Sequence, residues 1–218
     1  MTETESGEAL QRTDVPSSIR FVGPMLPKSP ADFQKPGWWT KLDESRPVVL
    51  VTQGTIANED PSQLVEPALA GLSHEDVMIV VANGGRDPNG VYSHIPANAI
   101  VERFIPFNEI LPKVDVFVTN GGYGGVNQAL SMGVPVIVAG TTEDKPAVAA
   151  RLAWSGAGIN LETDRPTPDQ VRTAVLMILR DGSFRRRARM LQTSFAQYDA
   201  LNEITQAVES CLPVAVIE

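Results

Sequence analysis

The sequence predicts an α/β fold: a single Rossmann-like domain with a parallel sheet of about six strands flanked by helices. Two observations lead to this prediction. Short runs that are apolar at every position alternate along the chain with longer segments whose apolar residues recur at helical spacing. Strands that are apolar throughout are buried on both faces, which is typical of parallel sheets covered by helices on either side.

The first 46 residues lack this alternation. Residues 1–17 are polar, and we expect a disordered tail there. Residues 18–46 contain many prolines and glycines, and we expect an irregular linker of the interdomain type, held against the fold by Trp38 or Trp39 and followed by a short helical turn. Residues 47–218 form the predicted domain.

The expected strands are runs rich in valine and isoleucine that end in polar or glycine-containing segments. The best defined reads "PVVLVTQGT", and the next reads "VMIVVANGG". The predicted strands cover residues 47–55, 77–85, 99–106, 115–122, 134–140 and 157–162.

The expected helices carry recognisable start and stop signals. Asp60 and Pro61 open one helix, Thr167 opens another, and Gly133 and Gly156 each end one. The basic run "SFRRRARM", which opens the last helical segment, is interpreted as a solvated helix face. The predicted helices cover residues 60–72, 107–114, 123–133, 145–156 and 167–182, with one or two more over 183–212.

Composition excludes several classes of function. The formal net charge of −8 argues against nucleic-acid binding, which needs a basic surface. A single cysteine, Cys211, excludes an internal disulfide and a paired-cysteine metal site. The N-terminus has no signal-peptide pattern, and no run approaches the ~20 apolar residues of a spanning helix. We therefore expect a cytoplasmic chain with no membrane span.

The stretch "TNGGYGGVNQAL" carries the main functional signal. Four glycines in six residues, Gly121, Gly122, Gly124 and Gly125, stand between a predicted strand and a predicted helix. Glycines at such a junction allow backbone amides to approach an anion, and the helix N-terminus adds partial positive charge. The pattern is neither GxGxxG nor a Walker loop. A tight turn that needs left-handed glycines is the alternative explanation.

A second loop, "TQGT", follows the first predicted strand. Ligands of open parallel sheets bind beyond the carboxyl ends of the strands, so both loops face the same edge. Two loops rich in amide and hydroxyl donors at one crevice suggest a diphosphate ligand. The sequence thus predicts an anion site at this edge.

The run "RFIPFNEILPKVDVFVTNGGYGGVNQALSMGVPVIVAGTTEDKPAVAARLAWSGAG" resembles the donor-binding signature of the UDP-glycosyltransferase family, which has the GT-B fold. The strand, the glycine loop, "ALSMGVPVIV", the acidic pair and a final "GAG" come in the family's order and spacing. The resemblance extends over most of the chain. It implies the C-terminal, nucleotide-sugar donor-binding domain, with a UDP- or TDP-sugar as substrate and no other cofactor.

The resemblance also assigns donor-site residues. It implies that Phe104 stacks on the nucleobase, that the backbone of Ile105 pairs with the base edge, and that Phe107 stands near the ribose, where the family often has Gln. Asn120 replaces the family's common His at the diphosphate. The remaining implied residues line the phosphates or hold the sugar: Gly54, Thr55, Gly121, Gly122, Gly124, Gly125, Glu143, Asp144 and Lys145. A solvated helix cap is the alternative for "TTEDK".

The family's other half, the acceptor domain with its catalytic histidine, is not recognisable in the sequence. His74 and His94 are expected in solvated loops, so no catalytic residue and no metal ligand is assigned. The resemblance implies the donor-binding half of an inverting, metal-independent glycosyltransferase that moves a hexose to a hydroxyl of a small-molecule acceptor.

Alternatives to this interpretation concern the missing half. The chain is expected to be a truncated part of a full enzyme. It could instead be a non-catalytic nucleotide-sugar-binding subunit that pairs with a separate acceptor chain, or a binding module without a reaction. An uncovered apolar surface would also permit a homo-oligomer.

Overall fold

The structure is a computed structural model of the 218-residue chain. It describes residues 16, 18–28, 30, 32–43, 46–56, 58–89 and 91–211. The tail expected over residues 1–17 therefore lies outside the described residues, apart from Pro16.

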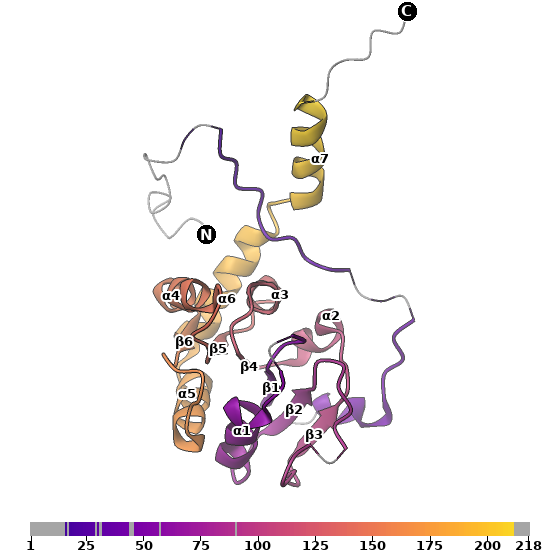
Figure 1. Ribbon diagram of the computed structural model, residues 1–218, viewed down its shortest axis with the longest axis vertical. Coiled ribbons are helices and arrows are strands. Elements are labelled where there is room, and N and C mark those ends of the chain that lie inside the picture. The colour runs from indigo at the N-terminus through magenta and orange to yellow at the C-terminus, as the bar shows by residue number, and fades with distance from the viewer. Residues whose placement is uncertain are drawn as a thin grey trace, which may run out of the picture.

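The described part of the chain forms one six-stranded sheet in which all neighbouring strands are parallel, in the order β3-β2-β1-β4-β5-β6 (Figure 1). The predicted fold class is confirmed. In the centre, Leu50 of β1 pairs with Val80 of β2 on one side and Phe117 of β4 on the other. The strands are β1 (Val48–Thr52), β2 (Met78–Ala82), β3 (Ala99–Glu102), β4 (Val116–Thr119), β5 (Val136–Val138) and β6 (Gly158–Asn160).

Each strand is shorter than the sequence pattern predicted. β1 ends at Thr52, so residues 53–55 belong to the following loop, and β4 ends at Thr119, before the glycines. The polar and glycine residues at the ends of the apolar runs leave the sheet because the chain turns there toward a helix. This places more residues in the loops at the carboxyl edge than the pattern indicated.

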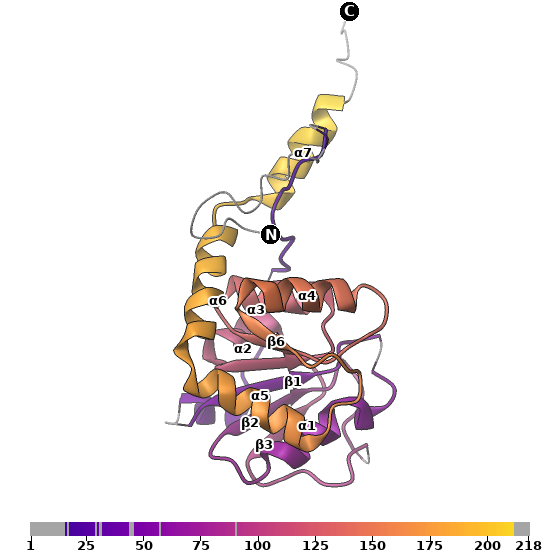
Figure 2. The same ribbon diagram turned by 90° about the vertical axis from the view of Figure 1, so that its left-hand side faces the viewer.

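Helices cover both faces of the sheet (Figure 2). The core on one face contains side chains of α1 (Val65–Leu72) and α5 (Pro168–Arg180). The core on the other face contains side chains of several elements. These are η1 (Gly37–Asp43), α2 (Phe107–Ile110), η3 (Leu111–Lys113), α3 (Tyr123–Ser131), α4 (Lys145–Ser155) and α6 (Gly182–Phe195).

The predicted helix signals act as expected. The Asp60 carboxylate accepts a hydrogen bond from the Ser62 amide, although the helix begins as η2 (Pro61–Gln63) before α1. Thr167 and Gln170 form a reciprocal capping box at the start of α5. Gly156 adopts a left-handed φ of 70° at the end of α4.

The linker is anchored by Trp39, which is 7% exposed and packs edge-on against Phe33 at 5.4 Å between ring centroids. Trp38 is only half-buried and donates to a Glu102 carboxylate oxygen at 2.5 Å. The expected helical turn is η1, which begins three residues earlier than "TKLDESRP". At the other end, α7 (Ala200–Cys211) projects away from the sheet (Figures 1 and 2), and Cys211 is exposed at its end.

No helix among the described residues is both long and apolar enough to cross a membrane.

Arg185 corrects the interpretation of the basic run as a solvated face. Its side chain is 28% exposed and donates to the carbonyl oxygens of Val114 (3.2 Å), Gly133 (3.3 Å) and Asp115 (2.8 Å). It also pairs with the Asp115 carboxylate at 3.1 Å. Burial lowers the pKa of the Arg185 guanidinium, and Asp115 opposes that shift. One arginine of the run therefore ties α6 to the segment that enters β4.

We predict that Arg185→Ala destabilises the chain by about 1–3 kcal/mol, because buried carbonyl acceptors lose their charged donor. Chemical denaturation measures this loss. Arg186→Ala, in the same run but exposed, serves as the matched control and should change the free energy of unfolding by less than about 0.5 kcal/mol. Equal effects of both substitutions would contradict the tethering role of Arg185.

Candidate functional site

The sheet changes winding direction between β1 and β4. The chain leaves β1 toward the face covered by α1, and it leaves β4 toward the face covered by α3. The two loops therefore diverge and open a crevice at the carboxyl edge, which is the position where open α/β sheets bind ligands. The predicted site residues in "TQGT" and "NGGYGG" occupy these two loops.

The two loops are joined directly. The Asn120 amide donates a hydrogen bond to the backbone oxygen of Gln53. Gly54, next to it, has a left-handed φ of 80°, and a Cβ there would stand 3.5 Å from the Asn120 amide. A Cβ on Gly140 would collide with the backbone oxygen of Asn120. Asn120 thus lies at the meeting point of the loops that follow β1, β4 and β5.

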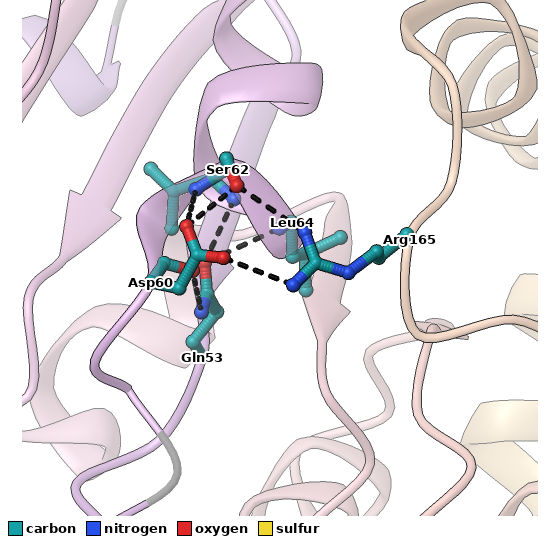
Figure 3. A network of polar contacts seen from close by, with 6 residues as sticks. Gln53, Asp60, Ser62, Leu64 and Arg165 are labelled. Atoms are coloured by element: carbon teal, nitrogen blue, oxygen red, sulfur yellow. Dashed lines mark hydrogen bonds and ion pairs between the residues drawn. The ribbon is translucent and has the colours of Figure 1, made fainter.

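Gln53 holds the first loop against the start of α1 by side-chain hydrogen bonds (Figure 3). It is 1% exposed, and its side-chain oxygen accepts from the amides of Leu64 (3.3 Å) and Val65 (3.1 Å) at the start of α1. Its side-chain nitrogen donates to the Asp60 backbone oxygen at 2.9 Å. A buried amide with its hydrogen-bonding capacity used in this way holds the loop in one conformation.

The structural reason for a glycine differs among the four glycine positions of the second loop. Gly121 has a φ of 90°, and a Cβ there would collide with Val138. Gly125 lies over Phe107 and Phe117, whose rings pack edge-on with centroids 5.3 Å apart. A collision and a left-handed φ therefore explain Gly121, whereas a Cβ on Gly125 would make only ordinary van der Waals contact with the two rings, at 3.6 Å.

Gly122 and Gly124 have no such explanation within the described chain. A Cβ on Gly122 would approach only the Asn120 side chain, at 3.9 Å, and a Cβ on Gly124 would meet nothing within 4 Å. The φ of Gly122 is −57°, which any residue adopts. The turn alternative raised by the sequence accounts for Gly121 but not for these two.

The start of α3 presents amides that lack an intrahelical acceptor beside these open positions. The first backbone bond of the helix runs from the Val126 amide to the Gly122 oxygen at 3.2 Å. The amides of Tyr123, Gly124 and Gly125 precede it and have no intrahelical acceptor. Gly122 has no side chain to cap them. These amides and the helix dipole favour a negative charge at this point.

A pocket of about 360 Å³ lies at the same edge, on the side of Asn120 that faces β5 and β6. It combines residues from the loops after β1, β4, β5 and β6, which are far apart in the sequence. The lining includes Gln53, Asp60, Asn120, Thr142, Lys145 and Arg165.

Of the predicted donor residues, Asn120 and Lys145 line this pocket. Lys145 is 4% exposed, whereas Glu143 and Asp144 beside it are exposed. Asp144 occupies the N-cap position of α4 but makes no side-chain capping bond, so the cap alternative for "TTEDK" has no hydrogen bond behind it.

The predicted base-binding residues lie outside the pocket lining. The Phe104 ring is 59% exposed, Ile105 is 3% exposed, and Phe107 is half-buried against Phe117. Phe104 is thus free to stack on a planar ligand, Ile105 has only its backbone to offer, and Phe107 is mainly a packing residue. Thr55 is exposed at the tip of its loop.

The sequence did not indicate Asp60 and Arg165 as site residues. Arg165 donates to the Asp60 carboxylate at 3.0 Å and to the Ser62 hydroxyl at 3.4 Å, closing the pocket between the loops after β1 and β6 (Figure 3). Hydrogen bonds from Ser62, supported by Arg165, hold the pKa of the Asp60 carboxyl below its ordinary value. No local pattern reveals this contact, because 105 positions separate the two residues.

Within the described ranges, no three His, Cys, Asp or Glu side chains lie close enough to hold a metal ion. His74 lies in the turn after α1, at the opposite edge of the sheet from the pocket, and His94 lies in the segment before β3. Both are exposed, as expected for loop residues.

A parallel sheet in this strand order, with a glycine-rich loop at the point of reversal, is the arrangement of a Rossmann-type α/β domain. The comparisons give the family. The model of the erythromycin biosynthesis protein CIII-like C-terminal domain matches residues 66–211. The chain belongs to this EryCIII-like C-terminal domain family of UDP-glycosyltransferases.

Individual relatives support this family membership. The chain is 47% identical to 4'-demethylrebeccamycin synthase of Lentzea aerocolonigenes over 201 residues, 91% of this chain and 46% of that protein. It is 38% identical to UDP-glucosyltransferase avaP of Aspergillus versicolor over 204 residues, 91% and 44% of the two chains. The structure of CalG4, the calicheamicin glycosyltransferase, matches with a TM-score of 0.72 and 28% identity over 87% of this chain and 47% of that one.

The chain thus spans about half the length of the curated relatives it matches. The predicted family and the GT-B-type fold are confirmed, and the chain matches the C-terminal domain of this family's glycosyltransferases.

We predict opposite stability effects at two glycines of the site. Gly140→Ala should destabilise the chain by about 1–3 kcal/mol, because its Cβ collides with the Asn120 backbone. Gly124→Ala should stabilise it by roughly 0.5 kcal/mol, because alanine is the better helix former and has free space. Chemical denaturation measures both. Destabilisation by Gly124→Ala would show that the fold requires this glycine.

We also predict that Ser62→Ala raises the pKa of the Asp60 carboxyl toward 3.8, because Ser62 is the main cause of its depression. A carboxyl whose pKa is lower in the folded chain than in the unfolded chain stabilises the fold at pH values above its unfolded-state pKa. This stabilisation is lost as the pH falls through its folded-state pKa. Carboxyl-detected NMR titration measures the shift. Ser73→Ala is the control, because the Ser73 hydroxyl donates to the Ala70 carbonyl and makes no contact with Asp60 among the described residues. An unchanged Asp60 pKa in Ser62→Ala would contradict the assignment.

Proposed function

We propose that the chain is the donor-binding half of an inverting, metal-independent glycosyltransferase that moves a hexose from a UDP- or TDP-sugar to a hydroxyl of a small-molecule acceptor. The observation that carries the proposal is the cluster of amides of Tyr123, Gly124 and Gly125, which lies beside the open positions of Gly122 and Gly124. Packing does not require these glycines, and they stand at the reversal point of the sheet where such folds bind nucleotides.

In this proposal the donor lies across the loops at the carboxyl edge. The exposed ring of Phe104 stacks on the base, and the backbone of Ile105 bonds its edge. Gly54, Thr55 and the glycine loop hold the diphosphate. The segment of Glu143, Asp144 and Lys145 holds the sugar end. Each assignment follows the family resemblance, and the exposure of Phe104 and burial of Ile105 agree with it.

The proposed reaction is a single displacement. The acceptor oxygen forms a bond to the anomeric carbon while the bond to the leaving diphosphate breaks, and the acceptor proton passes to a general base. The negative charge that develops on the diphosphate is stabilised by the amides of the glycine loop and by the helix dipole. In this scheme the backbone supplies electrostatic stabilisation that other enzymes obtain from a metal.

The general base is proposed to come from the acceptor half. Asp60, a pocket carboxylate, is a poor candidate because its depressed pKa and its pairing with Arg165 make it a weak proton acceptor. The curated relatives are about twice as long as this chain, which leaves room for an acceptor domain in the complete protein.

The alternative is a non-catalytic donor-binding subunit that pairs with a separate acceptor chain. Exposed apolar side chains on and beside α7, including Tyr198, Leu201 and Val208, favour a covering partner of some kind. Both versions share the donor site, so they differ only in whether the acceptor half is linked covalently.

The test is titration of the purified chain with UDP, TDP and UDP-glucose by calorimetry in the presence of a chelator. We predict binding with a micromolar dissociation constant, on the order of 8 kcal/mol, that the chelator does not change. The names of the UDP-glucosyltransferase relatives favour uridine over thymidine as the better ligand.

Gly122→Val is the matched variant. Its φ suits valine and its side chain has space, so the fold should persist while the branched side chain fills the phosphate position. We predict loss of UDP binding with an unchanged melting temperature. Wild-type affinity in Gly122→Val would overturn the placement of the diphosphate.

A further inference from the structure

Lys145 is the only charged side chain among the described residues that the fold buries almost completely, with 4% of its surface exposed. Lys145 is the first residue of α4, and a Cβ on Gly121 would stand 3.7 Å from the Cβ of Lys145. A Cβ on Gly140 would stand 2.7 Å from its Cδ. The aliphatic stem therefore lies between the loops after β4 and β5.

A buried ammonium is costly unless it is paired. Lys145 Nζ donates to the Thr142 hydroxyl at 3.2 Å and pairs with the Glu143 carboxylate. Both partners of the ammonium belong to the loop immediately before α4, so these contacts do not connect Lys145 to the apolar core. The lysine thus carries its charge at the pocket wall rather than into the protein interior.

The pairing with Glu143 is easily exchanged. The Glu143 side chain is 64% exposed, so its carboxylate is well solvated when it leaves the ammonium. Its backbone has a φ of 58°, a left-handed conformation that costs a non-glycine residue about 1 kcal/mol. Strained residues of this kind are found mainly at functional sites.

The pocket is lined by two cations, Lys145 and Arg165, and by the carboxylates of Glu59, Asp60 and Asp164. The other cation in the lining, Arg165, is engaged by Asp60 at 3.0 Å. Asn120 lines the pocket beside Lys145 and is neutral. A dianionic ligand entering here therefore meets one cation whose present partner is a solvated carboxylate.

We propose that Lys145 supplies the positive charge of the donor site and that its ammonium exchanges the Glu143 carboxylate for an oxygen of the donor's diphosphate. This inference rests on the proposed function and goes beyond it, because the family resemblance implies a sugar contact at this position. Asn120 stands where the family commonly has a histidine, and its side chain cannot carry a positive charge. Lys145, at the start of α4, supplies a positive charge at the same site instead.

The test compares wild type, Lys145→Gln and Glu143→Gln for binding of UDP and UDP-glucose by calorimetry and of uridine by ligand-observed NMR. UDP lacks the sugar, so a sugar contact does not contribute. We expect Lys145→Gln to weaken UDP binding roughly tenfold or more, as for loss of a charged hydrogen bond, and to leave uridine binding unchanged. Glu143→Gln, which removes the competing carboxylate, should strengthen UDP binding several-fold.

Lys113→Gln is the matched control, because Lys113 also pairs with an exposed carboxylate, Asp43, but at the opposite edge of the sheet. It should change neither affinity. Melting temperatures verify that each variant is folded, and Glu143→Gln, a surface change, keeps the inference testable if Lys145→Gln does not fold.

Three results would overturn the inference. They are unchanged UDP affinity in Lys145→Gln, an equal loss for UDP and uridine, or weaker UDP binding in Glu143→Gln. A loss seen only with UDP-glucose would return Lys145 to a sugar contact. Absence of UDP and uridine binding to wild type would instead overturn the proposed function, and this inference with it.

Discussion

The site depends on one junction at the centre of the sheet edge, where the Asn120 side chain donates to the backbone of Gln53. Gln53 in turn is buried and bonds the start of α1, so the loop after β1 has little freedom. Unsatisfied buried polar groups cost about 1–3 kcal/mol each, and this cost keeps the network intact. Two loops that diverge to opposite faces are thereby held as one rigid edge, with the glycine loop and Lys145 placed beside it. A rigid edge suits a site that stabilises developing charge, because its donors need no reorganisation during reaction.

Most of the fold was predictable from the sequence, because continuous apolar strands and capped amphipathic helices are local patterns. The start of α5 at Thr167 and the end of α4 at Gly156 were found by their cap signals. Strand ends were less predictable, since Gln53 and the glycines after Thr119 directly follow the apolar runs in sequence but lie outside the sheet. The loops at the carboxyl edge were predictable as a group, because parallel strands place all their ends on one side.

The details of the site were harder to predict because they depend on distant contacts. Arg165 meets Asp60 only through the packing of α5 on α1, and the burial of Lys145 follows from the loops around it. The sequence pattern indicated one role for all four glycines of the loop, which is anion binding. The structure separates Gly121, which packing and a left-handed φ require, from Gly122, Gly124 and Gly125, which packing does not require. Arg185 shows the same limit, since its run looks solvated and only the position of β4 reveals its tether.

The central claim is that this chain alone forms a diphosphate cradle at the reversal point of the sheet. The most direct measurement is amide NMR of the isotope-labelled chain during titration with UDP. We predict the largest shifts at the amides of Gly54, Gly122, Gly124 and Ile105, with little change at Gly182, which lies at the start of α6. Shifts centred elsewhere, or no shifts at saturating UDP, would contradict it.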